Sequence, residues 1–228
     1  MNEYSLFHRL KTSIRDRGIR KSIIGAYSYF YDYMYDLKYG IDTHSWVDLD
    51  ELDVNENQRE HAVLYQATRV VPLKRLFKDL NLPKNHVFID IGSGKGRVLL
   101  IAADYGFKKI KGIEFSKSLC AKAENNILRF RKKKKVATEI AIINIDAKDY
   151  QFEDDESVFF LFNPFDDIIL KEVLDNIYIS LKRHKRQIWM IYANAVHKNL
   201  IENTMNIVNS YSYNILEFDF MVYQVEPK

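Results

Sequence analysis

The stretch from Val87 to Arg97 constrains this chain more than any other part of its sequence. It begins with a short apolar run, residues 87–91, interrupted by Asp90, and continues with three glycines at alternate positions, Gly92, Gly94 and Gly96. The apolar run predicts a buried parallel strand with an acid at its carboxyl end, and an apolar helical pattern begins at Arg97. Strand, glycine turn and helix in this order predict a loop that binds a phosphate or a nucleoside.

The spacing of the glycines distinguishes between ligands. A phosphate-binding GxxxxGK[ST] loop needs Ser or Thr after its lysine, but Lys95 is followed by Gly96. A dinucleotide-binding GxGxxG loop would have its third glycine at position 97, where an arginine stands. The observed order, an acid, one residue and then GxGxG, allows close approach of the backbone to a ligand. A tight strand-to-helix turn without a ligand is the alternative.

Length and composition exclude several classes of protein. A chain of 228 residues with 47% hydrophobic residues suffices for one well-packed domain with an extension. A net charge of +3 is too small to indicate a nucleic-acid partner, and a single cysteine, Cys120, cannot form an intrachain disulfide. The histidines are scattered, so we predict no metal site. We expect a cytoplasmic protein, because the sequence contains no membrane-spanning apolar run and no signal-peptide core.

Residues 1 to about 40 have a helical pattern that differs from the rest of the chain. Gly18 separates one amphipathic helix from a second, which begins near Ile19 and carries Tyr27, Tyr31 and Tyr35 on one face. One interpretation is a pair of helices packed on the domain. A second is a lid or partner surface for anionic or aromatic ligands, and a third is binding to a membrane surface.

Two further segments precede the strands and helices of the main domain. Residues 40–60 are polar and acidic, which predicts a connecting loop, and residues 61–80 have a helical pattern that ends at Asn81-Leu82-Pro83. We therefore expect residues 1–60 to form an N-terminal helical extension with an acidic loop, and residues 61–228 to form the ligand-binding domain.

From Val87 onward, strand and helix patterns alternate. Strands are expected over residues 87–91, 110–114, 139–145, 157–162, 187–193, 211–217 and 220–226, and helices over 95–105, 116–131, 166–182 and 195–207. This alternation predicts an α/β fold, a Rossmann-like, doubly wound and mostly parallel sheet of seven strands with an antiparallel last strand. The basic run at residues 131–135 predicts a solvated helix end.

Acids stand at the ends of three successive strands. In a doubly wound sheet, ligands bind outside the carboxyl ends of the strands, beside the first strand. Asp90, Glu114 and Asp146 each stand at the carboxyl end of one of the first three expected strands. An acid at the position of Glu114 can bind both hydroxyls of a ribose.

The loop and the strand-end acids together resemble motifs of the class I S-adenosylmethionine-dependent methyltransferases. The resemblance implies that the cofactor is S-adenosylmethionine and that Asp146 binds the amino group of its adenine. It also implies that the cofactor contacts the residues of the loop, Asp90, Gly92, Ser93, Gly94, Gly96 and Arg97.

The fourth strand is followed by Asn163-Pro164-Phe165, which resembles the Asn-Pro-Pro-Tyr/Phe motif of amino-group methyltransferases, shortened by one proline. In that motif the Asn side chain and a backbone carbonyl accept hydrogen bonds from the target nitrogen, and the aromatic ring packs on the substrate. The resemblance implies that Asn163, Pro164 and Phe165 are catalytic and that Asn163 also lies at the cofactor. Tyr192 and Asn194, at the end of the fifth strand, are further candidates for this pocket.

Two other segments resemble parts of known methyltransferases. Residues 65–68 are similar to a Tyr-x-Pro-Thr segment that folds over the cofactor in seven-strand lysine methyltransferases, with Ala67 in place of the proline, which implies cofactor contacts from Tyr65 and Thr68. Gly40-Ile41-Asp42-Thr43 and the Asn-Pro-Phe strand end are similar to bacterial methyltransferases of unassigned substrate.

The resemblance implies in-line methyl transfer to an amine nitrogen of a protein lysine or of a small molecule. The alternatives are an RNA methyltransferase and a non-catalytic S-adenosylmethionine-binding module. The acidic segment 48–56 would attract a lysine-bearing protein and repel RNA, whereas the lysines at 132–135 act in the opposite direction.

Overall fold

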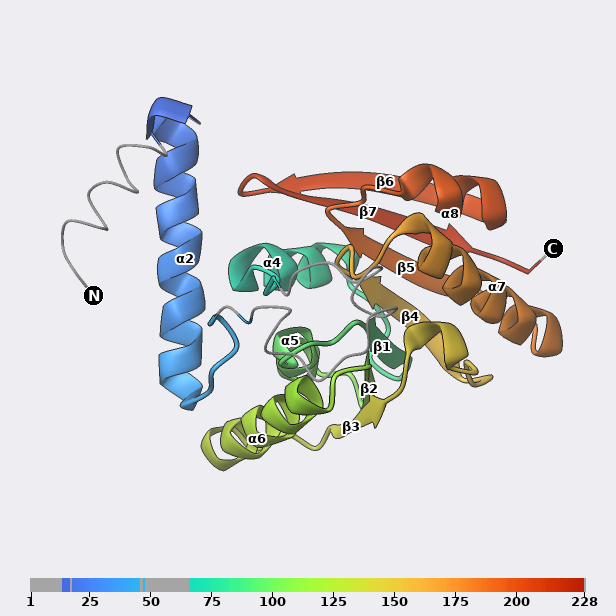
Figure 1. The fold of residues 1–228 in the computed structure, drawn as a ribbon, viewed down its shortest axis with the longest axis horizontal. Coiled ribbons are helices and arrows are strands. Elements are labelled where there is room, and N and C mark those ends of the chain that lie inside the picture. The colour runs from blue at the N-terminus through green and yellow to red at the C-terminus, as the bar shows by residue number, and fades with distance from the viewer. Residues whose placement is uncertain (1–13, 17, 46, 48–65, 228) are drawn as a thin grey trace.

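The computed structural model describes residues 14–16, 18–45, 47 and 66–227. These residues form one seven-stranded sheet in the order β3-β2-β1-β4-β5-β7-β6 (Figure 1). Strands β1 to β5 pair in parallel, and β7 runs antiparallel to its neighbours β5 and β6, which confirms the predicted Rossmann-like sheet. The strands are β1 (Val87–Ile91), β2 (Lys109–Glu114), β3 (Glu139–Asn144), β4 (Glu156–Leu161), β5 (Ile188–Ala193), β6 (Ile207–Ile215) and β7 (Phe218–Val225).

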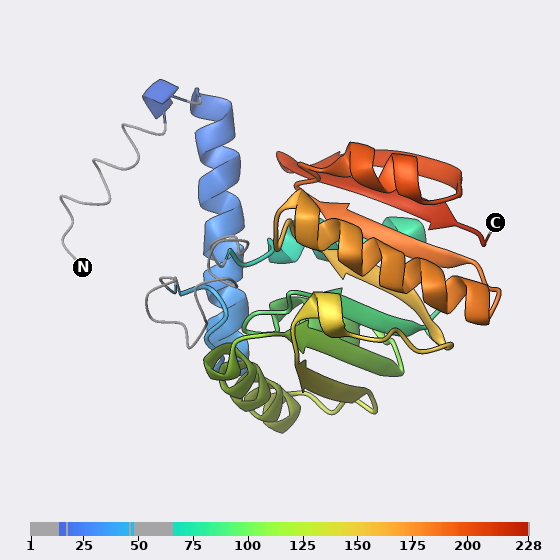
Figure 2. The same ribbon diagram turned by 45° about the vertical axis from the view of Figure 1, so that its right-hand side comes forward.

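Helices cover both faces of the sheet, and a further helix packs outside them (Figures 1 and 2). One face is covered by α4 (Val70–Leu80), α5 (Arg97–Tyr105) and α6 (Lys117–Lys133), and the other by α7 (Asp167–Arg183) and α8 (Lys198–Thr204). The outer helix, α2 (Ile19–Tyr39), lies against α4 and α6. Because both faces are covered, β1 and β4 are buried along their whole length, as their apolar sequences predict. Within the described residues, no helix is both long and apolar enough to cross a bilayer.

Most element boundaries lie within two residues of the prediction, and the larger differences are at α4, α8 and β6. The helix expected over residues 61–80 begins at Val70, after residues 66–69 without helical structure. The helix expected over 195–207 is the shorter α8, so β6 begins at Ile207 instead of residue 211. The turn between the last two strands lies at Leu216 and Glu217, which have φ of 54° and 59°. Such a turn normally carries Asn or Gly, so the sequence contains no signal for it.

A buried ionic network joins α2 to the beginning of α5. Arg97, the first residue of α5, is 2% exposed, and its guanidinium donates hydrogen bonds to the Thr43 hydroxyl at 2.6 Å and the Thr68 carbonyl at 3.2 Å. The same guanidinium pairs with the carboxylates of Asp32 at 3.4 Å and Asp36 at 3.5 Å. The two acids lie one turn apart on the buried face of α2, so this helix is joined to the domain by charge as well as by packing.

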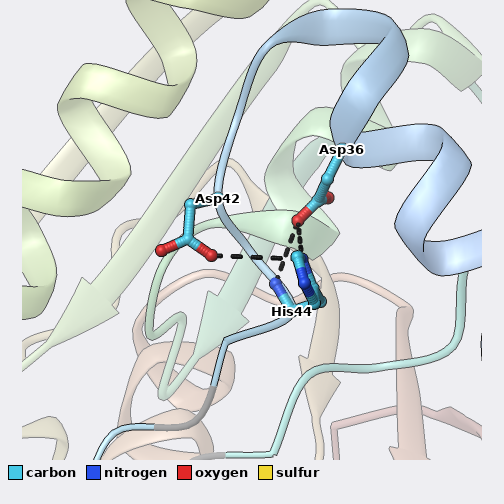
Figure 3. Close-up of side chains that lie close together, drawn as sticks. All are labelled: Asp36, Asp42 and His44. Atoms are coloured by element: carbon cyan, nitrogen blue, oxygen red, sulfur yellow. Dashed lines mark hydrogen bonds and ion pairs between the residues drawn. The ribbon is translucent and has the colours of Figure 1, made fainter. Parts of the chain in front are cut away.

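Asp36 also holds the loop that follows α2. Its carboxylate accepts hydrogen bonds from the backbone and hydroxyl of Thr43, both at 2.6 Å, and from the backbone of His44 at 3.0 Å. Figure 3 shows Asp36, Asp42 and His44 together, with ligand atoms within 4.8 Å of one another. Asp42 pairs with Lys95 of the glycine loop at 3.3 Å. Asp36 and Asp42 therefore pair with the two cations on either side of Gly96, Arg97 and Lys95, while His44 contacts both acids. The expected lack of a metal stays a prediction.

Replacing Asp36 tests how far the fold depends on this network. We expect Asp36→Ala to lower the free energy of unfolding by about 3–5 kcal/mol, because it removes one partner of a buried charge. Urea denaturation measures the change. Asp175→Ala is the control, because Asp175 forms an exposed pair with Lys171 on α7, and its loss should cost at most about 1 kcal/mol. Equal losses in the two variants would contradict the assignment of Asp36 as a buried partner of Arg97.

Candidate functional site

A cavity that is partly open to solvent lies at the carboxyl ends of β1, β2 and β4. This is the crevice in which doubly wound sheets bind ligands. Nine of the residues predicted from the sequence line it: Thr68, Asp90, Gly92, Ser93, Gly94, Arg97, Glu114, Asn163 and Pro164. The structure therefore brings together residues from the segment before α4, the glycine loop and the ends of β2 and β4.

The glycine loop is fastened to β2 by backbone hydrogen bonds. The N–H groups of Gly92 and Ser93 both donate to the carbonyl of Ile113, at 2.9 and 3.0 Å. The Glu114 carboxylate accepts a further bond from the Gly94 N–H at 2.8 Å. Gly92, Gly94 and Gly96 have φ of 78°, 52° and 82°, a region that favours glycine. The acid at the end of β2 thus orders the loop and itself faces the cavity.

Asp90 is a buried acid on the cavity wall. Its side chain is almost fully buried, and its Oδ2 atom has no hydrogen-bond partner among the described residues. Burial, and next the nearby charge of Glu114, raise the pKa of Asp90 well above its usual range. An unpaired buried carboxyl is costly, so its position on a cavity wall fits a ligand with a cationic group. S-adenosylmethionine carries an ammonium group of this kind, so the Asp90 carboxyl on this wall fits that cofactor.

Asn163 follows β4 and is held in place by a tyrosine of β5. It has a φ of 41°, which Asn tolerates better than most residues, and its Oδ1 accepts a hydrogen bond from the buried Tyr192 hydroxyl at 3.0 Å. Burial raises the pKa of Tyr192, so this hydroxyl stays protonated and donating at neutral pH. Tyr192 therefore fixes the rotation of the amide at the cavity wall.

Pro164 connects the loop after β4 to the glycine loop. A Cβ added at Gly92 would lie 2.6 Å from the Cβ of Pro164, closer than real Cβ atoms come to other carbons. The two loops that would hold cofactor and acceptor are therefore in direct contact, and glycine is required at position 92 by both its φ and this contact.

Phe165 was expected to pack on the substrate. In the structure it is 8% exposed and packs into the core beneath α7, while Phe162 lines the cavity, so a substrate contact of Phe165 stays a prediction. The left-handed conformation of Asn163 turns the chain, so that Pro164 meets the glycine loop and the next side chain enters the core.

Two other predicted residues, Gly96 and Asp146, are described by the structure and do not line the cavity. Gly96 is the N-cap of α5, and a Cβ there would lie 3.2 Å from Ala123 of α6, so it allows close packing of the helices. Asp146 accepts a hydrogen bond from the Lys148 N–H at 3.3 Å and caps the 3₁₀-helix η2 (Ala147–Asp149). Tyr65 lies outside the described residues.

Apolar residues of the cavity were not identified from the sequence. They are Val98, Phe115, Leu119, Phe160 and Phe162, with Gln66 and Ala67 beside them. Phe115 directly follows Glu114, so its position next to a strand-end acid could have identified it as a cavity residue. The others lie within apolar runs, where nothing in the sequence separates a cavity wall from the core.

Comparison with known proteins places this geometry in context. Residues 47–174 match the family described as histone methylation protein DOT1. A TehB-like SAM-dependent methyltransferase from Corynebacterium glutamicum has 14% identity and a TM-score of 0.50, over 69% of this chain and 89% of that protein. TrmN from Thermus thermophilus has 12% identity and a TM-score of 0.54, over 71% of this chain and 49% of that protein. At these identities the likeness shows the fold alone. No curated protein sequence matches the chain.

A pair of Gly→Ala changes tests the contact between the two loops. We expect Gly92→Ala to destabilise the protein by about 1–3 kcal/mol, because the new methyl group collides with Pro164. Gly25→Ala is the control, because Gly25 lies within α2 with no atom near its added Cβ, and alanine there should stabilise the protein by up to about 1 kcal/mol. Thermal denaturation measures both. An unchanged melting temperature for Gly92→Ala would show that the loops do not meet in solution.

Proposed function

Because the chain belongs to the family of the histone methylation protein DOT1, and is an S-adenosylmethionine-dependent methyltransferase, we propose that it transfers the methyl group to an amine nitrogen. The proposed acceptor is a lysine side chain of a protein or the amine of a small molecule. The alternatives to be separated by experiment are an RNA acceptor and cofactor binding without transfer.

The fixed amide of Asn163 is the observation that carries this proposal. It lies on the cavity wall together with Asp90 and the glycine loop, and its Oδ1 accepts the hydrogen bond from the Tyr192 hydroxyl. A carbonyl oxygen has two lone pairs, so Oδ1 can accept a second hydrogen bond, from the N–H of an amine. A neutral amine held through its N–H groups keeps its own lone pair free for the methyl carbon.

The remaining cavity residues fit the parts of the cofactor. We propose that the Asp90 carboxylate receives the ammonium group, that Glu114 lies at the ribose hydroxyls, and that Phe115 packs against the adenine. Thr68 and Arg97 close the cavity from the side of α2. For Tyr65, Gly96 and Asp146, direct contact with the cofactor is supported by the resemblance of their motifs alone.

In the reaction, this chain positions the acceptor and excludes water. The cofactor supplies a methyl group already activated by its sulfonium. Holding the acceptor nitrogen in line with that methyl can contribute about 7–11 kcal/mol toward the barrier. Asn163, fixed by Tyr192, supplies the orientation, and the apolar walls at Phe160, Phe162 and Pro164 keep water away.

Labelling with a radioactive methyl group tests the acceptor class. Cell lysate separated into protein, RNA and small-molecule fractions is incubated with the enzyme and methyl-labelled cofactor. We expect label in protein, recovered as methyl-lysine after acid hydrolysis, or in a small amine. Label confined to an RNase-sensitive fraction would overturn the amine proposal. Cofactor binding without label in any fraction would favour the non-catalytic module.

Substitution of Asn163 separates catalysis from cofactor binding and is measured with the acceptor so found. We expect Asn163→Ala to lower turnover about 100-fold, with little change in affinity for the cofactor, because the variant lacks the amide that orients the acceptor nitrogen. Tyr192→Phe should have a smaller effect in the same direction. Asn163→Asp, which keeps the acceptor oxygen, should retain more activity than alanine. Parallel loss of turnover and cofactor affinity in Asn163→Ala would assign the residue to the cofactor site or to the turn.

The raised pKa of Asp90 predicts a pH dependence of cofactor binding. The free protein holds a proton on Asp90 up to a pH above the usual carboxyl range, whereas the ammonium group favours the ionised form. Binding of S-adenosylhomocysteine should therefore release a proton, and affinity should rise with pH until the raised pKa is passed. Calorimetry in buffers of different ionisation enthalpy measures the release. Asp90→Asn should abolish it and Asp175→Asn should not; release that persists in Asp90→Asn would assign the proton to another group.

A further inference from the structure

A groove of about 900 Å³ lies between α2 and α4, and none of its lining residues lines the cofactor cavity. Tyr31 and Met34 of α2 and Val71 of α4 supply apolar walls. The groove is bordered by four basic side chains from both helices, Lys38, Lys74, Arg75 and Lys78, and by one acid, Asp79. The groove thus combines an apolar floor with a cationic border, and its concave shape suits an inserted helix.

The positive charge around the groove is only partly balanced. Asp104 pairs with both Lys74, at 2.5 Å, and Lys134, and Arg75 lies 4.0 Å from Asp79. The pKa of Lys74 is lowered by burial, with Lys38 acting in the same direction. The pKa of Lys134 is lowered by burial and then by Lys74 and Lys38. These cations repel one another, so an anionic ligand would relieve the repulsion.

An exposed apolar stripe on α2 continues the groove. It follows helical spacing along the whole helix and comprises Ile19, Ile23, Tyr27, Phe30, Met34 and Leu37, each at least 40% exposed. Figure 1 shows α2 at the outer side of the domain, with α4 and α5 between it and the sheet. Contiguous exposed apolar surface of this extent is characteristic of a binding surface.

We propose that the groove between α2 and α4 binds an acidic amphipathic helix of a partner protein. Apolar side chains of that helix pack on Tyr31, Met34 and Val71, and its carboxylates pair with Lys38, Lys74 and Lys78. A second copy of this chain fits less well, because antiparallel pairing of two α2 helices would bring Arg20 and Lys21 of one copy toward Lys38 of the other. A flat bilayer cannot fill a concave groove between two helices.

Two designed peptides test the proposal by fluorescence anisotropy with the full chain. Both are fluorescein-labelled helices of about five turns with the same Leu and Phe face; one has Glu and the other Lys at the remaining positions. We expect the acidic peptide to bind and the basic one not to. Met34→Glu, and Lys38→Glu combined with Lys78→Glu, should each weaken binding by about tenfold or more. The matched controls Ile179→Glu and Lys182→Glu, both on α7 across the sheet, should leave it unchanged.

Affinity for S-adenosylhomocysteine, measured for every variant, shows that the variants are folded, since the groove and the cofactor cavity share no lining residue. Equal binding of the two peptides, or unchanged binding by the groove variants, would overturn the proposal. So would preferential binding of the wild type to phosphatidylserine vesicles or to single-stranded RNA that the groove variants lose. A dimer detected by light scattering and abolished by Met34→Glu would assign the groove to self-association instead.

Discussion

The charge of Arg97 is the constraint around which the N-terminal half of this molecule is arranged. A guanidinium this deeply buried is tolerated only with ionic partners and hydrogen-bond acceptors close by. Asp32 and Asp36 of α2 supply the charges, and the Thr43 hydroxyl and Thr68 carbonyl complete the set. Because Arg97 directly follows the glycine loop, the residues that neutralise it also support the wall of the cofactor cavity.

The helix that carries these acids has two different faces. Its inner face holds Asp32 and Asp36 against Arg97, and its outer face presents the apolar stripe from Ile19 to Leu37. Lys95 extends the inner contact, since it pairs with Asp42 and donates to the Ser45 carbonyl at 2.9 Å. A ligand on the outer face of α2 would therefore bind a helix whose opposite face contacts the motif that holds the cofactor. These contacts join α2 and residues 40–45 to the glycine loop, and the domain boundary at residue 60 stays a prediction.

Much of the fold could be predicted because it depends on local patterns. Buried parallel strands are continuously apolar and alternate with helices from Val87 onward, which predicts the sheet, and the glycines of residues 92–96 mark the first crossover and the switch point. Asp90, Glu114 and Asn163 could be placed at the cavity because each lies at, or within two residues of, the carboxyl end of a strand.

The contacts that could not be predicted join residues far apart in the sequence or depend on exact backbone angles. Nothing local indicates that Arg97 pairs with Asp36, or that Lys111 inside β2 is buried against Glu156 at 2.6 Å. The positive φ of Asn163 sends Phe165 into the core, and the turn at Leu216 lacks the usual glycine or asparagine. Such features follow from tertiary packing and are visible only once the elements are assembled.

The contact between Gly92 and Pro164 has a consequence for how such a site can change over evolution. The first residue belongs to the glycine loop and the second to the loop that we propose holds the acceptor, and no space for a side chain remains between them. A lineage that altered the acceptor loop would have to keep a residue at 164 that fits against a bare backbone. A substitution at either position therefore requires a compatible residue at the other. A change of substrate would come more readily from residues elsewhere around the pocket than from this pair.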